Sequence, residues 1–409
     1  MKLLTFLGVA QYAPTIYVWQ EQEHSSRFAP AASCRFLHPD FLTVFLTEEA
    51  HQQVFPDFCR ALPEGLKPDP IPIPFGKDDR ELWQIFNQVS GAVRPGEEVA
   101  FDITHGFRSL PLLGLLAAAF LRAGLGVSLR AVLYGAYVPG QERTPMFDLT
   151  PMLSLLEWAA AADRFNRTGD ARYLASLLKN ARNSLAKATQ GDPAQTEQIG
   201  RLGNLAGALE DISQSLRLIR PYQAMTAIAG LSERMEKAQP ALQSAAIVRP
   251  FSMLLESVER TYRPLSLSDP LTTTPLPVVL DRQRAMINWY VEREQWVQAV
   301  ALAREWVVSW AMLQLGLMPI TGRVARQRAE DVLNAEANDF ADAKKTGTPF
   351  TPIFLKRLPQ VETVLSLWLN LTGIRNDILH AGMREDPGKP DVLIKQARDC
   401  IDRLNALPV

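Results

Sequence analysis

The chain has 409 residues, more than one hydrophobic core usually organises, so two or three domains are expected. Its 47% hydrophobic and 21% charged residues are ordinary for a globular protein, and its formal net charge of −1 excludes a globally basic nucleic-acid coat. Its three cysteines form no CxxC pair, which argues against a disulfide framework and against a zinc site. The longest apolar run, Leu110 to Leu121, is too short to span a bilayer. We therefore expect a cytoplasmic protein.

The first 150 residues alternate between short apolar runs and amphipathic stretches. Strands are predicted at Leu3–Leu7, Thr43–Leu46, Ile71–Phe75, Val99–Ile103 and Leu129–Tyr134, and helices at Lys77–Val93 and Leu110–Ala123. Repetition of strand, helix and strand predicts a mostly parallel sheet with helices on both faces. Residues 1–150 are therefore predicted to form a doubly wound α/β domain.

From Met152 onward, apolar residues recur at spacings of three and four, which is typical of helices. Predicted helices lie at Leu153–Arg167, Ala171–Ala188, Gln195–Leu218, Tyr222–Glu236, Ala241–Arg260, Asp281–Leu315, Gly322–Ala341, Leu358–Gly382 and Val392–Leu407. The segment Arg263–Pro277 is rich in Pro, Ser and Thr and predicts a connection. We therefore expect two all-α regions, 151–275 and 276–409. The absence of a fixed-period repeat argues against a solenoid.

Three predicted strands end in residues suited to ligand binding: Gly8, Thr47 and the segment Asp102–Pro111. Ligands of doubly wound sheets bind at the carboxyl ends of the strands. In the last segment, Ser109 is a candidate helix N-cap and Arg108 adds positive charge, which predicts an anion site. A dinucleotide site is disfavoured, because no second glycine follows Gly8 before Gly65. A tight strand-to-helix connection without a ligand remains an alternative.

Several segments within residues 1–150 carry a family resemblance. They are Gly8 with Tyr12 and Tyr17, Val44-Phe45-Leu46-Thr47-Glu48-Glu49-Ala50, Ile73-Pro74-Phe75-Gly76 and Asp102-Ile103-Thr104-His105-Gly106-Phe107-Arg108-Ser109-Leu110-Pro111. Together they resemble a CARF domain, the Rossmann-like sensor domain of type III CRISPR ancillary proteins. The resemblance implies a homodimer that binds a cyclic oligoadenylate across its two-fold axis, with cyclic tetra-adenylate favoured and hexa-adenylate possible.

The same resemblance implies a set of ligand-contacting residues. They are Gly8, Thr47, Thr104, His105, Gly106, Arg108 and Ser109. Asp102, at the end of a predicted strand, is either a further contact or a structural cap. A ligand with two-fold symmetry suits an isologous dimer, because each subunit presents the same groups to half of the ring.

The segment Leu367–His380 predicts a helix with a polar side. Leu367, Leu371, Ile374 and Ile378 share one face, and Asn376 and His380 lie together on nearly the opposite face, with Arg375 between. A histidine can transfer protons to and from RNA oxygens, and an arginine can hold a phosphate as negative charge builds up. Solvated surface charge is the alternative interpretation of the same residues.

The Arg-Asn-x3-His pattern in a helical domain behind a CARF-like sensor resembles the HEPN ribonuclease motif. The resemblance implies cleavage of single-stranded RNA without a metal or another cofactor, by 2′-hydroxyl attack that gives a cyclic phosphate and a 5′-hydroxyl end. It implies a composite site from two HEPN domains, with Arg375, Asn376 and His380 catalytic in each. Asp377, Ile378 and Leu379 receive no catalytic role.

The activator implied for this endoribonuclease is the cyclic oligoadenylate, and the context implied is antiviral defence. The domains are then a CARF-like sensor at 1–150, a helical connector and dimer support at 151–275, and a HEPN-like domain at 276–409. Two other functions stay open. One is a ligand-binding regulator with a silent HEPN scaffold, and the other is a CARF domain that also degrades its cyclic ligand.

Other residues of 276–409 are expected to be structural. The helix Asp281–Leu315 is predicted to pack beside the motif helix. Arg323, Arg326 and Arg328 are candidates for holding RNA phosphates, but a solvated helix face is favoured for them. The tryptophans Trp289, Trp296, Trp306 and Trp310 have the spacing of a helical core rather than of a base-stacking platform.

Overall fold

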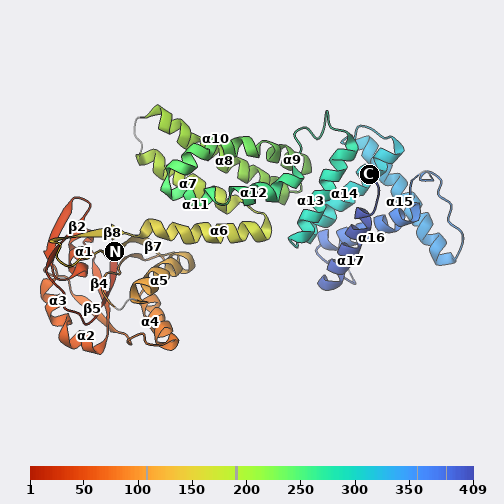
Figure 1. Ribbon diagram of the computed structural model, residues 1–409. Helices are drawn as coiled ribbons and strands as arrows, with labels where there is room; N and C mark the ends of the chain where they lie inside the picture. Colours follow the sequence, from red (N-terminus) through yellow and green to blue (C-terminus); the bar gives the residue numbers. More distant parts are fainter. Residues whose placement is uncertain (107–108, 189–191, 357, 384) are drawn as a thin grey trace. The chain divides into compact units, whose positions relative to one another are not determined.

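The computed structural model describes residues 1–106, 109–188, 192–356, 358–383 and 385–409 (Figure 1). The chain divides into two compact units, Met1–Glu157 and Trp158–Val409. The first contains a mostly parallel sheet with helices on both faces, and the second is helical, so the predicted fold class is confirmed. The further division of the helical part into 151–275 and 276–409 stays a prediction. Within the described ranges, no helix combines the length and apolar character needed to cross a membrane.

The sheet of the first unit is built around the apolar strand β1. Its strands are β1 (Lys2–Leu7), β2 (Thr15–Trp19), β3 (Gln22–Ser26), β4 (Phe41–Leu46), β5 (Pro68–Pro72), β6 (Glu98–Asp102), β7 (Ser128–Gly135) and β8 (Arg143–Asp148), in the order β3-β2-β8-β7-β6-β1-β4-β5. β1 pairs in parallel with β4 and β6. Leu3 and Leu7 join the core on one face, and Leu4 and Phe6 join the core on the other.

Helices cover both faces of this sheet. The first core includes side chains of α1 (Ala29–Leu37), α2 (Glu48–Gln53) and α3 (Phe55–Ala61), and the second includes side chains of α4 (Asp79–Gly91) and α5 (Ser109–Leu125). Phe58 is fully buried in the first core, and Ile85 in the second. The carboxyl edge therefore belongs to a rigid sheet that is covered by helices on both faces.

Three strands were not predicted, namely β2, β3 and β8. β3 has the sequence Gln-Glu-His-Ser-Ser and contains no apolar residue, so it carries no strand signal. It pairs antiparallel with β2, which pairs in parallel with β8, and β8 pairs antiparallel with β7. The parallel sheet therefore continues into an antiparallel extension, whose border strand β3 the hydrophobic pattern does not reveal.

The second unit is organised around one buried apolar cluster that runs from Trp158 to Leu407. Its helices are α6 (Ser154–Thr168), α7 (Arg172–Ala188), α8 (Pro193–Arg217), α9 (Pro221–Ala229), α10 (Leu231–Ser244), α11 (Arg249–Ser252), α12 (Leu255–Tyr262), α13 (Leu276–Glu292), α14 (Trp296–Leu315), α15 (Arg323–Thr346), α16 (Val361–Leu379) and α17 (Pro390–Asn405). The boundary between the two units falls inside α6. Trp289, Trp306 and Trp310 are buried and Trp296 packs against the cluster, as predicted from their spacing.

Some predicted helices are broken in the structure. The predicted helix Asp281–Leu315 is two helices, α13 and α14, separated by a turn in which Glu294 has φ +56°. The predicted helix Tyr222–Glu236 is divided at Gly230 into α9 and α10. A tight turn between helices that pack on a shared core leaves the spacing of apolar residues nearly unchanged, so the pattern conceals the break.

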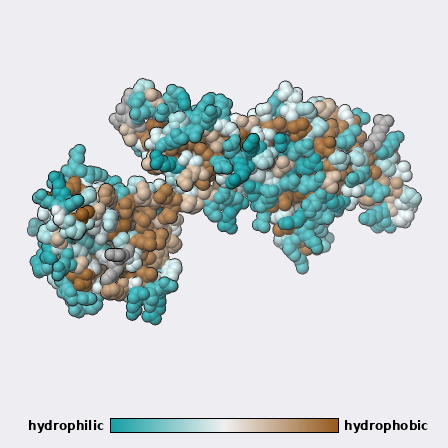
Figure 2. Space-filling model, viewed as in Figure 1, coloured by the Kyte–Doolittle hydropathy of each residue, from teal (hydrophilic) through white to brown (hydrophobic). Residues whose placement is uncertain are grey.

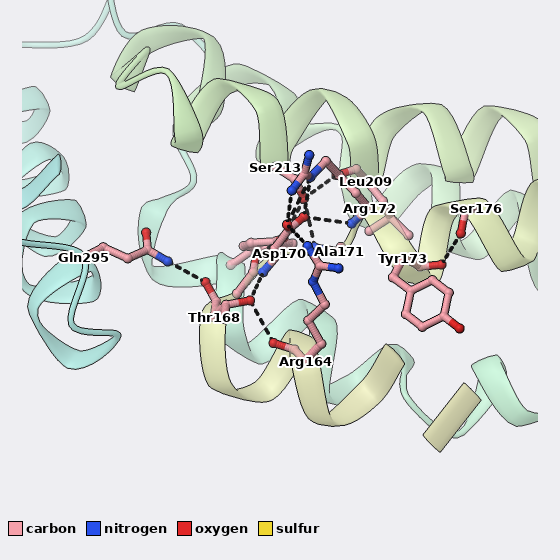
Figure 3. A network of polar contacts seen from close by, with 12 residues as sticks. Arg164, Thr168, Asp170, Ala171, Arg172, Tyr173, Ser176, Leu209, Ser213 and Gln295 are labelled. Carbon is pink, nitrogen blue, oxygen red and sulfur yellow. Dashed lines mark hydrogen bonds and ion pairs between the residues drawn. The ribbon is translucent and has the colours of Figure 1, made fainter. Parts of the chain in front are cut away.

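The turn between α6 and α7 is tied to several other helices of the same unit, as Figure 3 shows. Gln295 Nε2, just before α14, donates to the Thr168 carbonyl oxygen at 2.8 Å. Ser213 Oγ of α8 accepts the Ala171 N–H at 3.0 Å and donates to the Leu209 carbonyl oxygen at 2.8 Å. These bonds satisfy backbone groups of the turn and connect residues of 151–275 directly with the start of α14.

Candidate functional site

Most of the predicted ligand residues lie along one edge of the sheet. The pairing of β1 with β4 sets Leu7 beside Leu46, so Gly8 and Thr47 follow neighbouring strands. β6 lies on the other side of β1 and ends at Asp102, which brings Thr104 to the same edge. This edge holds the carboxyl ends of the parallel strands, where doubly wound sheets bind their ligands. The predicted grouping of Gly8, Thr47 and Thr104 is therefore present.

Two glycines at this edge allow close packing of the backbone. A Cβ atom on Gly8 would lie 3.3 Å from the Cα of Gly106. Gly106 has φ +118°, and a Cβ there would lie 2.9 Å from Leu110 Cδ1. The loops that follow β1 and β6 therefore touch at a point that excludes larger residues. This packing explains the two glycines without a ligand. Gly106 is exposed at this edge, whereas Gly8 is buried.

Asp102 has a structural role at the end of β6. Its side chain is fully buried, and its carboxylate accepts hydrogen bonds from the Ser33 hydroxyl and, at 2.9 Å, from the Thr104 N–H. Burial raises the pKa of this carboxyl above its usual range. Thr104 Oγ1 accepts the Gly135 N–H at 2.8 Å. Of the two roles considered for Asp102, the structure supports the cap.

His105 points into the protein rather than out of it. Only 8% of the residue is exposed, and its Nε2 accepts the backbone N–H of Ala29 at 3.0 Å. Its ring centroid lies 4.3 Å from that of Tyr12. Burial lowers the pKa of the imidazole to about 3, so the ring is neutral at physiological pH. His105 thus fixes the start of α1, a role that the sequence pattern did not suggest.

The remaining predicted ligand residues flank this edge. Thr47 is the N-cap of α2, where its hydroxyl accepts the Ala50 N–H at 3.3 Å. It lines a small cavity of about 210 Å³ together with Leu46, Glu48, His51, Pro70 and Pro72. Ser109 is the first residue of α5 rather than the residue before it, so its prediction as an N-cap was wrong. Arg108 lies outside the described residues.

The second predicted site is on α16, which is anchored by its apolar face. Val364, Leu365, Leu367, Leu371 and Ile374 are buried in the core of the helical unit. The Trp368 ring lies 4.7 Å from the Arg304 guanidinium carbon, and its Nε1 donates to Asn334 Oδ1 at 2.9 Å. The partner helix is α14, as predicted, and it packs against α16. The buried face of α16 therefore fixes the position of its last turn.

Arg375, Asn376 and His380 occupy the last turn of α16 and its cap. Arg375 Nη1 donates to Asn376 Oδ1 at 3.1 Å, and both side chains are half-buried. The predicted helix continued to Gly382, but α16 ends at Leu379 and His380 is its C-cap. The His380 N–H still donates to the Asn376 carbonyl oxygen at 2.9 Å, and the residue is exposed. The structure thus keeps the three residues within one turn.

Asp377 lies in the same motif but faces inward. It is 6% exposed, and its Oδ2 accepts the Gly388 N–H at 3.1 Å. Its carbonyl oxygen accepts the Gly382 N–H at 3.0 Å. The carboxylate therefore fixes the loop that follows His380. Asp377 has no catalytic role in the prediction, and the sequence signal for its inward direction is its spacing of three from Ile374, which is also buried.

A groove of about 870 Å³ lies between α16 and α17. The charged residues that line it are Asp377, Asp386, Asp391, Asp399 and Lys395. Four carboxylates and a single ammonium group make this groove unfavourable for a phosphodiester chain. Any RNA bound at His380 is therefore expected to approach from outside this groove.

The arginines of α15 differ in their surroundings. Arg326 Nη2 donates to Glu305 Oε2 at 2.6 Å, and Arg326 Nη1 donates to Ser309 Oγ at 3.0 Å. Arg323 and Arg328 are exposed. Arg326 therefore belongs to the packing between α14 and α15, and only the other two remain on a solvated face. Among the described residues, no group of three or more His, Cys, Asp or Glu is arranged to hold a metal ion.

Comparison with known protein families gives a match in the helical region. Residues 154–266 match a family model described as CRISPR-associated protein MJ1674, second domain. A curated relative, CRISPR-associated protein MJ1674 of Methanocaldococcus jannaschii, is 28% identical over 154 residues, which are 36% of this chain and 23% of the relative. Residues 154–266 are therefore similar to a domain of a CRISPR-associated protein. The matched segment spans about a quarter of that relative's length.

A solved structure is also similar to this chain. It is Enterococcus italicus Csm6 bound to cyclic hexa-2′-fluoro-hexa-dAMP, with a TM-score of 0.43 and 11% sequence identity. The similarity covers 99% of this chain and 92% of that chain.

Proposed function

We propose that this protein is a cyclic oligoadenylate-activated endoribonuclease that cleaves single-stranded RNA in type III CRISPR antiviral defence, without a metal. The observation that carries the proposal is the hydrogen bond between Arg375 and Asn376, one turn before the exposed His380. The match of residues 154–266 to a CRISPR-associated family model and the grouping of Gly8, Thr47 and Thr104 at one sheet edge support the sensor half of the proposal.

His380 is the residue that moves protons in the proposed reaction. As a base it removes the proton of an RNA 2′-hydroxyl, whose oxygen attacks the adjacent phosphorus. The bond from phosphorus to the 5′-oxygen breaks, a 2′,3′-cyclic phosphate forms, and the leaving oxygen takes a proton from an imidazolium. Each chain supplies one histidine of this kind, so a second copy of the site supplies the other proton transfer.

Arg375 stabilises the charge that develops on the phosphate. A guanidinium stays protonated and can hold two phosphate oxygens at once. Its contact with Asn376 Oδ1 restricts its orientation before RNA binds, and the Asn376 carbonyl oxygen also accepts the N–H of His380. Preorganised charge of this type is a large contribution to catalysis. Asn376 is therefore proposed as the residue that aligns the other two.

The pairing of two copies is supported by an exposed apolar face in the first unit. Leu112, Leu116 and Phe120 follow one another at intervals of four along α5 and are 62%, 47% and 52% exposed. Figure 2 shows a hydrophobic surface over the α4 and α5 side of this unit. Apolar patches of this kind mark interaction sites. We propose that the same face of a second copy covers it.

The ligand acts on the nuclease by population shift. For the cyclic oligoadenylate to activate cleavage, it must bind the active arrangement more tightly than the resting one. Cyclic tetra-adenylate is the favoured activator, and cyclic hexa-adenylate is the alternative. An assay with both rings decides between them.

The test is cleavage of labelled single-stranded RNA by the full-length protein, with chelator present and with or without each ring. His380→Ala and Arg375→Ala should each lower the ligand-stimulated rate by at least about a hundredfold. Arg375→Lys should recover only part of it, because an ammonium lacks the planar fork. His38→Asn is the matched control, since His38 is exposed and has a left-handed φ of 47° that asparagine tolerates.

Each alternative function has its own outcome in this test. A protein that binds the rings but never cleaves RNA would be a regulator with a silent HEPN scaffold. Cleavage of the cyclic oligoadenylate by the His380→Ala variant would show that the sensor also degrades its ligand. Activity that persists in both alanine variants would refute the site on α16.

A further inference from the structure

A second polar surface lies at the end of β3, outside the predicted ligand residues. It is a groove of about 450 Å³ lined by His24, Ser25, Ser26, Arg27, Phe28, Asp57, Arg60 and Ala61. It combines two guanidinium groups with two serine hydroxyls, which are the groups that proteins use to hold phosphate oxygens. None of these residues was predicted as a ligand contact, because β3 carries no strand signal.

The direction of the strands places this groove at the sensor edge. β8 runs opposite to β7, β2 runs parallel to β8, and β3 runs opposite to β2. β3 therefore points the same way as β7, β6 and β1, and its carboxyl end at Ser26 reaches the edge that carries Gly8 and Thr104. The chain between Leu7 and Thr15 passes along this edge from β1 to β2.

Arg27 is connected to the sensor loop by direct hydrogen bonds. Its Nε donates to the Tyr12 carbonyl oxygen at 3.0 Å. The Tyr12 hydroxyl accepts the Gly8 N–H at 3.2 Å and donates to the Gly8 carbonyl oxygen at 2.8 Å. The Tyr12 ring also packs on that of His105. Arg27 thus contacts Tyr12, which in turn contacts both Gly8 and His105.

The charges of the groove leave it positive. Asp57 is the acid that lines it, and it serves both Arg27, at 3.7 Å from Nη1 to Oδ2, and Arg60. The side chains of Arg27 and Arg60 are 51% and 74% exposed. Among the hydrogen bonds between described residues, Arg27 donates through Nε alone. Apart from the ion pair of Nη1 with Asp57, its terminal N–H groups are therefore available to a bound anion.

We propose that Arg27 and Arg60 bind phosphodiester groups of the cyclic oligoadenylate and form a phosphate subsite of the sensor. This inference rests on the proposed function for the identity of the ring. The terminal nitrogens of Arg27 take one phosphate, and Arg60 adds charge farther along the groove. Binding of a phosphate also exchanges the weak contact with Asp57 for a charge-assisted hydrogen bond.

The test is calorimetric binding of cyclic tetra- and hexa-adenylate to the full-length protein and its variants. Arg27→Gln should weaken binding of the activating ring by about tenfold or more, and Arg60→Gln should weaken it less, because a charge-assisted hydrogen bond is lost only in the first. Both variants should show a smaller loss of affinity with added salt than the wild type. Arg94→Gln is the matched control, since Arg94 is exposed in the same unit and precedes β6 at the opposite edge.

Further variants separate binding from loop ordering. Arg27→Lys keeps the positive charge and should recover part of the affinity. Arg60 makes no hydrogen bond to the loop among the described contacts. Any effect of Arg60→Gln on binding is therefore due to the loss of its positive charge. If Arg27→Lys binds as poorly as Arg27→Gln and Arg60→Gln binds normally, Arg27 only orders the loop and the proposal is overturned. Thermal unfolding of each variant verifies that it is folded.

Failure of the proposed function has a different signature. If the wild type binds the ring and Arg27→Gln binds it equally well, the subsite is refuted and the sensor stands. If the wild type binds neither ring, the sensor ligand is wrong, and linear tri-adenylate becomes the probe of the groove. Binding of that probe that Arg27→Gln weakens would support a phosphate site, and no binding would refute it.

Discussion

His105 stabilises the first unit only while its imidazole is neutral. Its pKa is about 3 in the folded chain because of burial, against an ordinary value of 6.5. Below pH 6.5 the unfolded chain therefore binds a proton that the folded chain does not, and the free energy of unfolding falls. The contribution of this group is fully present above pH 6.5 and is lost between about pH 6.5 and 3, at about 1.4 kcal/mol per pH unit.

We expect the wild type to lose about 2 kcal/mol of stability between pH 6.5 and pH 5 through this one group. His105→Gln keeps a polar side chain near the Ala29 N–H but does not titrate, so its stability should change less over the same range. Urea unfolding of both proteins at the two pH values measures the difference. Parallel pH profiles would show that His105 does not control acid stability.

That Gly8, Thr47 and Thr104 lie at one edge of the sheet could be predicted, but the contacts made there could not. The segment around Thr104 and His105 is distinctive in sequence, so the loop after β6 could be singled out. Whether the imidazole meets a ligand or accepts the N–H of Ala29 depends on a contact between residues far apart in the sequence. Arg27 was missed for the same reason, since only the strand order brings it to this edge.

At the scale of an element, the turn between α6 and α7 depends on Gly169. This residue has φ +66°, and a Cβ there would lie 2.1 Å from Trp289 Cζ2. The Tyr262 hydroxyl donates to its carbonyl oxygen at 2.7 Å. Gly169→Ala should therefore destabilise the protein by about 3 kcal/mol or more, because it adds a steric clash to an unfavourable backbone conformation.

The matched control for this change is Gly347→Ala. Gly347 lies in the same unit, has φ +72°, and a Cβ there meets nothing within 4 Å, so its loss should be only about 1 to 2 kcal/mol. Denaturant unfolding of the two variants separates the free-energy cost of the steric clash from the cost of the positive φ. Equal losses would mean that the α6–α7 turn moves away from Trp289 at little cost.

Helices were easier to predict than their ends. The apolar spacing of α7, α8 and α15 was sufficient to find them, because one face of each packs on the core. The breaks at Gly230 and Glu294 are set by how the following helix folds back, and spacing does not record that. The position of His380 was affected in the same way, since the helix stops one residue before it.

At the scale of the whole molecule, the proposed half site in each chain would make activity depend on protein concentration. The specific rate of RNA cleavage should stay constant while the protein is dimeric and fall in proportion to concentration below the dissociation constant of the dimer. Leu116→Glu, on the exposed face of α5, should move this fall to higher concentration by at least about tenfold, because it places a charge in an apolar contact.

Leu218→Glu is the control for that experiment, since Leu218 is 67% exposed and lies in the helical unit. Cleavage rate against protein concentration, together with sedimentation of the same samples, measures the effect. A specific rate that does not change with dilution for a sedimenting monomer would contradict the two-copy site.

The fold class was predictable because β1, β4 and β6 are apolar on both faces and alternate with helices. The antiparallel extension was not predicted. Its border strand β3 has no apolar residue, whereas β2 (Thr15–Trp19) was missed although its residue types favour a strand. The division into two compact units was expected from length, but the place of the boundary inside α6 depends on which core each turn of that helix joins.

The single core of the helical unit has a consequence for proteolysis. Tyr290 of α13 donates to the Leu216 carbonyl oxygen at 2.6 Å, and the Tyr262 and Trp289 rings lie 6.5 Å apart, so residues on both sides of the connection before α13 share one interior. A protease cut in that connection would leave two pieces that each lack part of their packing. A single cut in that connection would therefore not release the helices of the proposed nuclease as an intact, separately packed fragment.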